Sequence, residues 1–347
     1  MPRPPIFDGH NDCLLRLMRA GGRPALGQFR EGGPGHVDLP KAREGGFAGG
    51  FFAIFVPDTG PFYMEEMLRP EYDLPLAEMV AEADALPIAL HQAGLLLELD
   101  RRGDLRLCRS AAEIRAAMAD GQLAAVMHME GAEAIGPDLD ALDVLHAAGL
   151  RSLGPVWSRE TIFGHGVPFR YPSTADTGPG LTEAGQRLVA RCADMRIMVD
   201  TSHLTERGFW DIAEAGVPLI ATHSNAHAIC PQARNVSDAQ LRAIGETGGM
   251  VGLNFAGAFL RPDGQMRAEG ALEWMVRHLD HMLAMAGEDH VGLGSDFDGA
   301  VIPAEIGSTA GLDALRQAME QHGYGDRLIE KICHANWLAC CERLWGE

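Results

Sequence analysis

The chain alternates short apolar runs with stretches of helical periodicity, and this alternation constrains its fold more than any other feature. Eight apolar runs of strand length occur along the 347 residues. The expected strands cover residues 6–12, 50–57, 123–129, 150–157, 197–201, 218–222, 250–255 and 290–294. Strands that alternate with helices form parallel sheets, and eight of them close a (β/α)8 TIM-like barrel. We therefore predict an α/β barrel, with residues 1–347 as a single domain.

The helical segments carry start signals that support this assignment. Ser110 with Glu113, and Ser237 with Gln240, have the spacing of a capping box, in which each side chain bonds the other's backbone. The glycine-rich segment 32–50 is expected to be a long loop that approaches the site. The expected helices cover residues 74–100, 110–121, 139–148, 182–195, 205–215, 237–247, 268–286, 309–322 and 326–344.

Composition excludes several classes of partner. The formal net charge of −19 would repel nucleic acids and anionic membrane surfaces, and the only lysines are Lys41 and Lys331. No stretch is long and apolar enough to span a bilayer. His10 comes too early in the chain to leave room for a signal peptide. The seven cysteines are scattered and odd in number, so we expect reduced thiols in a cytoplasmic protein.

Potential metal ligands cluster at the ends of the expected strands. In such a barrel, catalytic groups come from the carboxyl ends of different strands and meet in one cleft. Imidazole nitrogens and carboxylate oxygens suit zinc, and their agreement over five strand ends indicates a metal site. The candidates are His10 and Asp12, His128 and Glu130, Asp200 and His203, His223, and Asp296 and Asp298.

Alternation along a strand helps to separate ligands from their neighbours. His128 and Glu130 face the same side, but Glu130 lies nearer the mouth, so His128 is expected to be a buried supporting residue. A calcium loop starting at Asp296 is excluded, because its twelfth position is Gly307 and not a glutamate. In some barrel proteins a carboxylated lysine at a strand end bridges two metal ions. Neither lysine of this chain follows a strand, so such a bridge would have to be an aspartate or glutamate carboxylate. The chain also lacks the nucleophile elbow, the phosphate-binding loop and the dinucleotide-binding fingerprint.

These residues resemble the renal (membrane) dipeptidase family, a zinc-dependent branch of the amidohydrolase superfamily. The resemblance covers nearly the whole chain, and its motifs occur in the same order and spacing. The matching motifs are Asp8-Gly9-His10-Asn11-Asp12, His36-Val37-Asp38-Leu39-Pro40, Glu130-Gly131-Ala132-Glu133, Asp200-Thr201-Ser202-His203, Thr222-His223-Ser224-Asn225, Ala233-Arg234-Asn235-Val236 and Gly294-Ser295-Asp296-Phe297-Asp298-Gly299.

The resemblance implies a dipeptidase with two zinc ions that share a hydroxide for attack on the peptide carbonyl. It also implies a small dipeptide substrate, with a D-residue accepted at the C-terminal position, and a homodimer. The implied roles are a bridging Glu130, His10 and Asp12 on one zinc ion, His203 and His223 on the other, Asp296 as the proton-transfer residue, and Arg234 as the ligand of the substrate carboxylate.

One departure from the family bears on the substrate. Mammalian members carry a substrate-binding histidine after the fourth strand, and Trp157 occupies the corresponding position here. An indole donates one hydrogen bond and carries no charge, whereas His165 in the following loop could substitute for the histidine. Two alternatives therefore remain: an amidohydrolase that acts on another amide or lactam, and a catalytically silent metal-binding relative.

Overall fold

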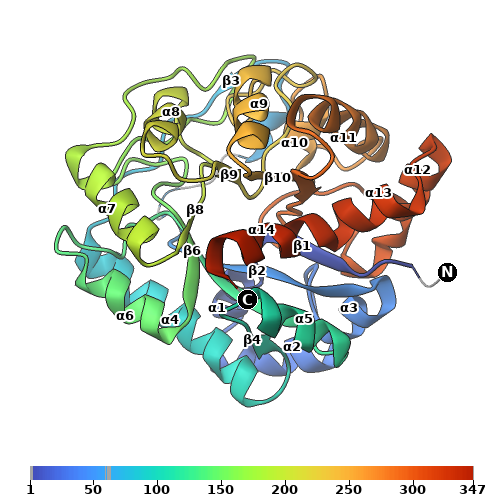
Figure 1. Cartoon of the computed structure of the whole chain (residues 1–347), viewed down its shortest axis with the longest axis horizontal. Helices are drawn as coiled ribbons and strands as arrows, with labels where there is room; N and C mark the ends of the chain where they lie inside the picture. Colours follow the sequence, from blue (N-terminus) through green and yellow to red (C-terminus); the bar gives the residue numbers. More distant parts are fainter. Residues whose placement is uncertain (1–2, 59, 61–63, 347) are drawn as a thin grey trace.

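The eight expected strands form one parallel barrel in the computed structural model, which describes residues 3–58, 60 and 64–346 (Figure 1). The strands pair in the order β8-β6-β5-β2-β1-β11-β10-β9, and a bridge between Asp200 and Ile220 closes the ring. The (β/α)8 prediction is therefore confirmed. The barrel strands are β1 (Ile6–Asn11), β2 (Phe47–Phe55), β5 (Ala124–Glu130), β6 (Leu150–Gly154), β8 (Met198–Val199), β9 (Ile220–Ala221), β10 (Met250–Leu253) and β11 (Val291–Leu293).

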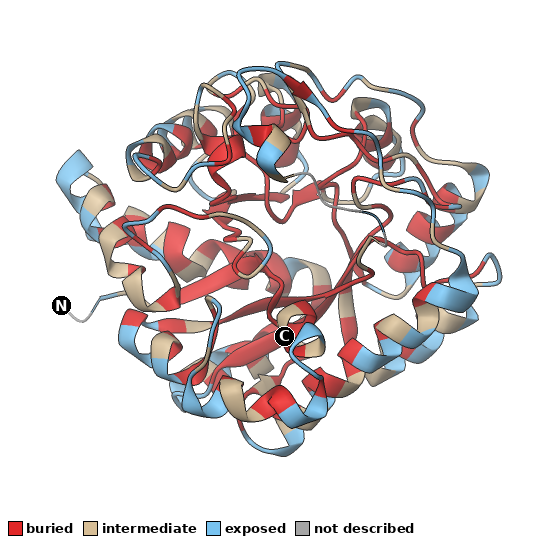
Figure 2. Cartoon of the chain, turned by 180° about the vertical axis from the view of Figure 1, so that it is seen from behind, coloured by how far each residue is buried: buried red, intermediate tan, exposed pale blue. Residues whose placement is uncertain are grey.

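Helices surround the barrel, and their inner faces are buried while their outer faces are exposed (Figure 2). Ser237 caps α9 in the predicted capping box with Gln240. Ser110 also caps its helix, α5, but the Glu113 carboxylate accepts a hydrogen bond from the backbone N–H of Arg109 at 2.6 Å. The helices are α1 (Cys13–Arg19), α2 (Gly27–Glu31), α3 (Leu39–Gly45), α4 (Glu82–Arg101), α5 (Ala111–Ala119), α6 (Asp140–Ala148), α7 (Glu183–Asp194), α8 (Glu206–Glu214), α9 (Asp238–Glu246), α10 (Gly257–Leu260), α11 (Leu272–Ala286), α12 (Asp313–His322), α13 (Asp326–Glu330) and α14 (Asn336–Trp345).

The last helix, α14, closes the amino end of the barrel. Trp337 lies in one apolar cluster with Phe7 and Phe51, and its indole N–H donates to the Leu293 carbonyl at 2.9 Å. Apolar side chains therefore fill this end of the barrel. The opposite end, where the strands finish, is the end at which the functional residues of such barrels gather.

Three segments differ from the expectation. The presumed loop 32–50 contains α3, because Asp38 caps that helix by accepting a hydrogen bond from the Lys41 backbone N–H at 2.9 Å. Helix α4 begins at Glu82, and part of the segment before it pairs as β3 (Tyr72–Asp73) with β7 (Arg170–Tyr171). The segment expected as one C-terminal helix comprises α13, a π-helical turn at Lys331–Ala335 and α14.

Two further expectations concern the cysteines and the membrane. All seven cysteines are free and buried, as expected for reduced thiols. Within the described ranges, none of the helices combines the length and the apolar character that crossing a membrane requires.

Candidate metal centre

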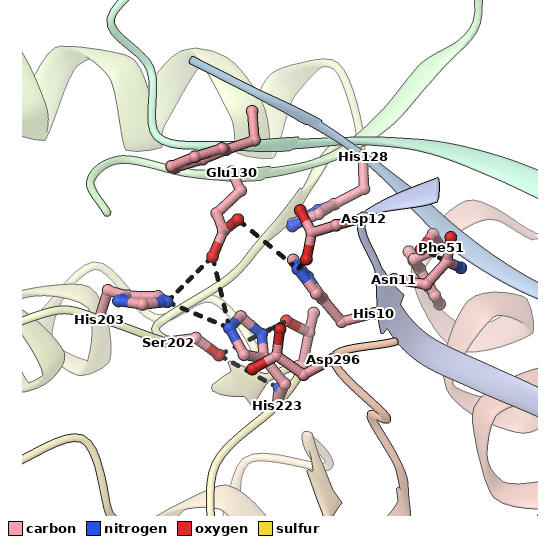
Figure 3. Close-up of polar contacts among 12 residues, drawn as sticks. His10, Asn11, Asp12, Phe51, His128, Glu130, Ser202, His203, His223 and Asp296 are labelled. Carbon is pink, nitrogen blue, oxygen red and sulfur yellow. Dashed lines mark hydrogen bonds and ion pairs between the residues drawn. The ribbon is translucent and has the colours of Figure 1, made fainter. Parts of the chain in front are cut away.

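The strand-end residues singled out from the sequence converge at the carboxyl end of the barrel (Figure 3). Each comes from a different strand end, except for one pair from the first strand. The residues are His10 on β1, Asp12 directly after β1, Glu130 at the end of β5, and His203, His223 and Asp296 in the loops after β8, β9 and β11.

Glu130 lies at the centre of this group, with imidazoles on both sides (Figure 3). Its Oε1 is 2.9 Å from Nε2 of His203 and 3.4 Å from Nε2 of His223. Its Oε2 is 3.6 Å from Nε2 of His10. The two carboxylate oxygens of Glu130 therefore face different histidines.

Two further carboxylates complete the group on the side of β1 and β11. Asp12 Oδ2 lies 3.5 Å from Nε2 of His10. Asp296 follows β11 in a left-handed conformation, with φ of 59°, and its Oδ2 accepts a hydrogen bond from the Asn254 amide at 3.0 Å. The other Asp296 oxygen, Oδ1, does not bond this amide.

Hydrogen bonds from neighbouring residues orient the two loop histidines. Nδ1 of His203 is 2.9 Å from the Ser158 hydroxyl. Nδ1 of His223 is 2.8 Å from the Thr222 hydroxyl, which donates to Asp200 at 2.6 Å. Both rings thus keep Nε2 directed at Glu130. Such partners on the far nitrogen are usual for histidines that ligate metals.

The electrostatics of the group follow from its burial. Burial raises the pKa of Glu130 well above its usual range and lowers the pKa of His203 and His223 well below theirs. Burial alone would also lower the pKa of His10, but the charges of Glu130 and Asp12 outweigh it and raise the pKa to about 10. His203 and His223 are therefore neutral donors, and a buried set of carboxylates and imidazoles of this kind is suited to hold cations.

The donor atoms fit a metal ion in a further respect. Both ring nitrogens of His10 are buried and have no hydrogen-bond partner among the described residues. Two groups of three residues each bring their donor atoms within 4.8 Å of one another. The groups are His10, Glu130 and His223, and His10, Asp12 and Asp296. A buried imidazole without a partner is costly unless something else coordinates it. The residues therefore fit the nitrogen and oxygen ligands that zinc prefers.

Arg234 lies beside this group and has only neutral partners. Its Nη2 donates to the His223 carbonyl at 3.1 Å and its Nη1 to the Ser224 hydroxyl at 3.4 Å, while Nε has no partner in the described part of the chain. Burial lowers the pKa of Arg234 to about 10, opposed by the nearby charges of Asp296 and Glu130. A buried cation with neutral partners is suited to receive an anionic group of a ligand.

A cavity of about 310 Å³ opens onto the cluster. Aromatic residues form one wall, in which Phe169 from a loop stacks on Phe259 from α10, with ring centroids 6.1 Å apart. The Arg234 guanidinium lies 5.6 Å from the centre of the Phe259 ring. Arg234 is not itself a lining residue, but it contacts two residues that are, His223 and Phe259. The lining includes Asp12, Glu130, His203, His223, Asp296, Phe55, Trp157, Phe169, Phe259 and Met266.

Trp157 lines this cavity, and its ring centre is 5.8 Å from that of His203. His165 is not part of the lining, because its Nδ1 bonds the Gly180 carbonyl at 3.0 Å. His165 therefore does not take the place of the histidine that Trp157 replaces.

The remaining candidates lie outside the cluster. His128 is held below it, with Nδ1 2.9 Å from the Ser152 hydroxyl and Nε2 3.7 Å from Asp200, as expected for a supporting residue. Neither lysine reaches the cluster: Lys41 bonds backbone carbonyls in its own loop, and Lys331 pairs with Glu288 at 2.7 Å.

Sequence reasoning missed several residues that support the site. Asn254 directly follows β10, so the strand-end rule that found the ligands could also have found it. Ser158 and Phe169 lie in loops and Phe259 lies in the short helix α10, and no local pattern marks them. Their place depends on the tertiary fold alone.

A parallel barrel with buried imidazoles and carboxylates at its carboxyl end is the arrangement of a metal-dependent hydrolase. Comparison with known proteins narrows this class. The family model of the membrane dipeptidases, peptidase family M19, matches residues 1–344. The chain therefore belongs to the membrane dipeptidase family, as its motifs suggest, and it is an enzyme of the metallo-dipeptidase class.

Individual relatives agree with this assignment. A metallopeptidase from Rhodobacter sphaeroides, solved with a phosphinate mimic of the dipeptide L-Ala-D-Ala, is 55% identical, with a TM-score of 0.96 and coverage of 99% of this chain and 100% of that one. Dipeptidase AC, a family M19 metallopeptidase, is 56% identical, with a TM-score of 0.95 and coverage of 99% of both chains. An uncharacterized protein from the pqqA 5′ region of Klebsiella pneumoniae is 45% identical over 267 residues, which are 76% of this chain and 98% of that protein.

Proposed function

We propose that the chain is a binuclear zinc dipeptidase that hydrolyses small dipeptides, including those with a D-residue at the C-terminal position. The observation that carries the proposal is the position of Glu130, whose two oxygens face His10 on one side and the His203–His223 pair on the other. The mimic of L-Ala-D-Ala bound by the Rhodobacter sphaeroides relative supports the same substrate class.

The proposed metal ligands are those that the family resemblance implies, and the convergence of their side chains supports them. Glu130 would bridge two zinc ions, with His10 and Asp12 on one ion and His203 and His223 on the other. When bound, the two ions activate water for attack and polarise the scissile carbonyl.

Asp296 is the proposed proton-transfer residue. Burial raises its pKa, so that it accepts and releases a proton more readily near neutral pH than an ordinary aspartate. Asn254 holds Oδ2 at 3.0 Å and fixes the orientation of the carboxylate. The carboxylate would take a proton from the attacking water and pass it to the departing amine.

Arg234 is the proposed ligand of the substrate's C-terminal carboxylate. Its guanidinium has neutral partners and lies behind the cavity wall at His223 and Phe259. A planar guanidinium offers paired donors to a carboxylate. Anchoring this group at a fixed distance from the cluster would select a dipeptide by its length.

The test is hydrolysis of L-Xaa-D-Xaa and L-Xaa-L-Xaa dipeptides by the zinc-loaded enzyme and by its Asp296→Asn variant. We expect turnover by the wild type and a fall in kcat of about 100-fold or more in the variant, because general acid–base catalysis contributes about 10²–10⁴-fold. Asp104→Asn is the matched control: this carboxylate is also buried but pairs with Arg30 away from the cavity, so kcat should be unchanged.

The outcome separates the alternatives. Absence of turnover on every dipeptide, with zinc bound, would contradict the proposal. Activity on other amides or lactams would then indicate a different amidohydrolase, and activity on none of them would indicate a silent metal-binding relative.

Two further predictions belong to this proposal. The free cysteines support a cytoplasmic location, which localisation of a tagged chain would test. A homodimer is expected from the family resemblance, and sedimentation would measure it.

A further inference from the structure

A buried carboxylate beside the site, Asp298, joins the motif that contains Asp296 to the motif that begins at His36, to which the proposed function gives no role. Its side chain is 2% exposed and accepts a hydrogen bond from Nε of Arg16 at 2.9 Å. It also accepts from the backbone N–H of His36 at 2.6 Å, and its own N–H donates to Nδ1 of His36 at 2.8 Å. Asp298 therefore links α1, the loop before α3 and the turn after β11.

The turn after β11 is held in an unusual backbone conformation. Asp296 and Asp298 both have positive φ, 59° and 70°, a region that residues other than glycine adopt uncommonly, although aspartate and asparagine tolerate it better than most. Gly299 packs so closely that an added side-chain carbon would overlap the carboxylates of Asp12 and Asp296. Contacts outside the turn must hold this geometry. The backbone N–H of Asp12 donates to the Phe297 carbonyl at 2.8 Å, the N–H of Asp296 donates to the His10 carbonyl at 3.0 Å, and the Asn254 amide holds Asp296. The bonds of Asp298 are the polar contacts that hold the turn on the side of α1 and the loop before α3.

The partners of Asp298 are themselves fixed. Arg16 belongs to α1, which starts directly after Asp12, and its Nη2 donates to the Val37 carbonyl at 2.6 Å. Lys41 ties the same loop by donating to the Gly33 and Gly35 carbonyls at 2.7 and 2.9 Å. A movement of the turn would therefore disturb both the loop and α1.

We propose that Asp298 is a positioning residue, which holds the Asp296 carboxylate at a fixed place relative to Asp12. The inference rests on the proposed function, in which Asp296 transfers the proton. Asp298 touches neither the cavity nor the ligands, so it acts through the turn. Loss of its bonds should let Asp296 shift while the substrate anchor at Arg234 stays in place.

The test compares Asp298→Asn with the wild type by steady-state kinetics on the best dipeptide and by zinc analysis. Asparagine tolerates positive φ and keeps one acceptor, but it removes the charge that Arg16 bonds. We expect kcat to fall by about 10- to 100-fold, since a misplacement of about 1 Å can cost 10²-fold, with KM and zinc content close to wild type. Asp104→Asn is again the control and should leave kcat unchanged.

A second variant, Arg16→Met, keeps both bonds between Asp298 and His36 and should also lower kcat, with partial recovery in Arg16→Lys. It decides the question if Asp298→Asn does not fold. Unchanged kcat in the folded variants, a loss of zinc that accounts for the loss of activity, or an equal fall in Asp104→Asn would overturn the inference while the dipeptidase proposal stands. A wild type without activity on any dipeptide would overturn both.

Discussion

Replacing Arg234 by methionine should lower activity on dipeptides without lowering the stability of the fold. Methionine keeps much of the side-chain length and removes the charge. Activity and stability should respond differently to the loss of this charge. In the free enzyme the arginine is buried with neutral partners, and it gains an anionic partner only when substrate binds.

The expected loss of activity follows from the substrate side. A buried carboxylate that loses its cationic partner costs about 3 to 5 kcal/mol, which corresponds to roughly a hundredfold to a few thousandfold in kcat/KM. A dipeptide amide lacks this carboxylate. Its hydrolysis should already be slow in the wild type and should change little in Arg234→Met.

The expected stability follows from the pKa. Burial lowers the pKa of Arg234 from 12.5 to about 10, so at pH 7 the charged side chain destabilises the fold by about 3 kcal/mol. This penalty is fully present below pH 10 and eases as pH rises from there to 12.5. The hydrogen bonds to Ser224 and the His223 carbonyl offset about 1 kcal/mol each. Arg234→Met should therefore unfold at the same urea concentration as the wild type or at a slightly higher one.

The assay measures kcat/KM on L-Ala-D-Ala and on its amide, together with urea unfolding at pH 7. Arg316→Met is the control: Arg316 is also buried, donates to the carbonyls of Pro4 and Gly45, each at 3.0 Å, and does not line the cavity. It should leave kcat/KM unchanged. An equal loss on the free acid and the amide, or a loss of several kcal/mol in stability, would refute the reasoning and make Arg234 a structural residue.

Three other predictions concern the metal, the pH dependence and the cavity wall. Chelation should abolish activity and lower the Tm measured by calorimetry, and two equivalents of zinc should restore both, because buried carboxylates then regain their cations. Burial lowers the pKa of His278 to about 4, so this residue contributes stability that is present above pH 6.5 and lost as pH falls toward 4. Between pH 6.5 and 4, the free energy of unfolding measured with urea should therefore fall by about 3 kcal/mol less in His278→Gln than in the wild type. Trp157→Ala should raise KM about tenfold, because the substrate loses an apolar wall next to His203, and kinetics on a dipeptide panel would detect it.

The barrel could be predicted because its signal is local and repeated. Each apolar run of strand length became a strand within a few residues of its expected bounds, and the closing order follows from right-handed connections between neighbouring parallel strands. Because the carboxyl ends of parallel strands meet at one edge of the barrel, the strand assignment also placed His10 on β1 beside Glu130 on β5. Helix α3 was missed because its segment is rich in glycine, although Asp38 is a good helix cap.

The supporting residues could not be predicted in the same way, because they depend on contacts far apart in the sequence. The bond between Arg16 and Asp298 joins residues 282 positions apart, and no spacing rule relates them. His128 is the exception among the supporting residues. Its alternation with Glu130, one step deeper in the strand, predicted a buried supporting residue, and its ring bonds Ser152 below the cluster.

The backbone at His203 shows why the ligands are harder to place than the strands. His203 has a φ of 69°, and it follows a strand of only two residues, so neither strand alternation nor helical spacing determines where its ring lies. Tertiary contacts hold this conformation: Val167 donates a backbone hydrogen bond to the His203 carbonyl at 2.8 Å, and Ser158 contacts its ring. Asp296 is a second case, held by Asn254 and by the turn that Asp298 secures. The strain lies at the residues to which we assign the chemistry, and long-range contacts stabilise it there.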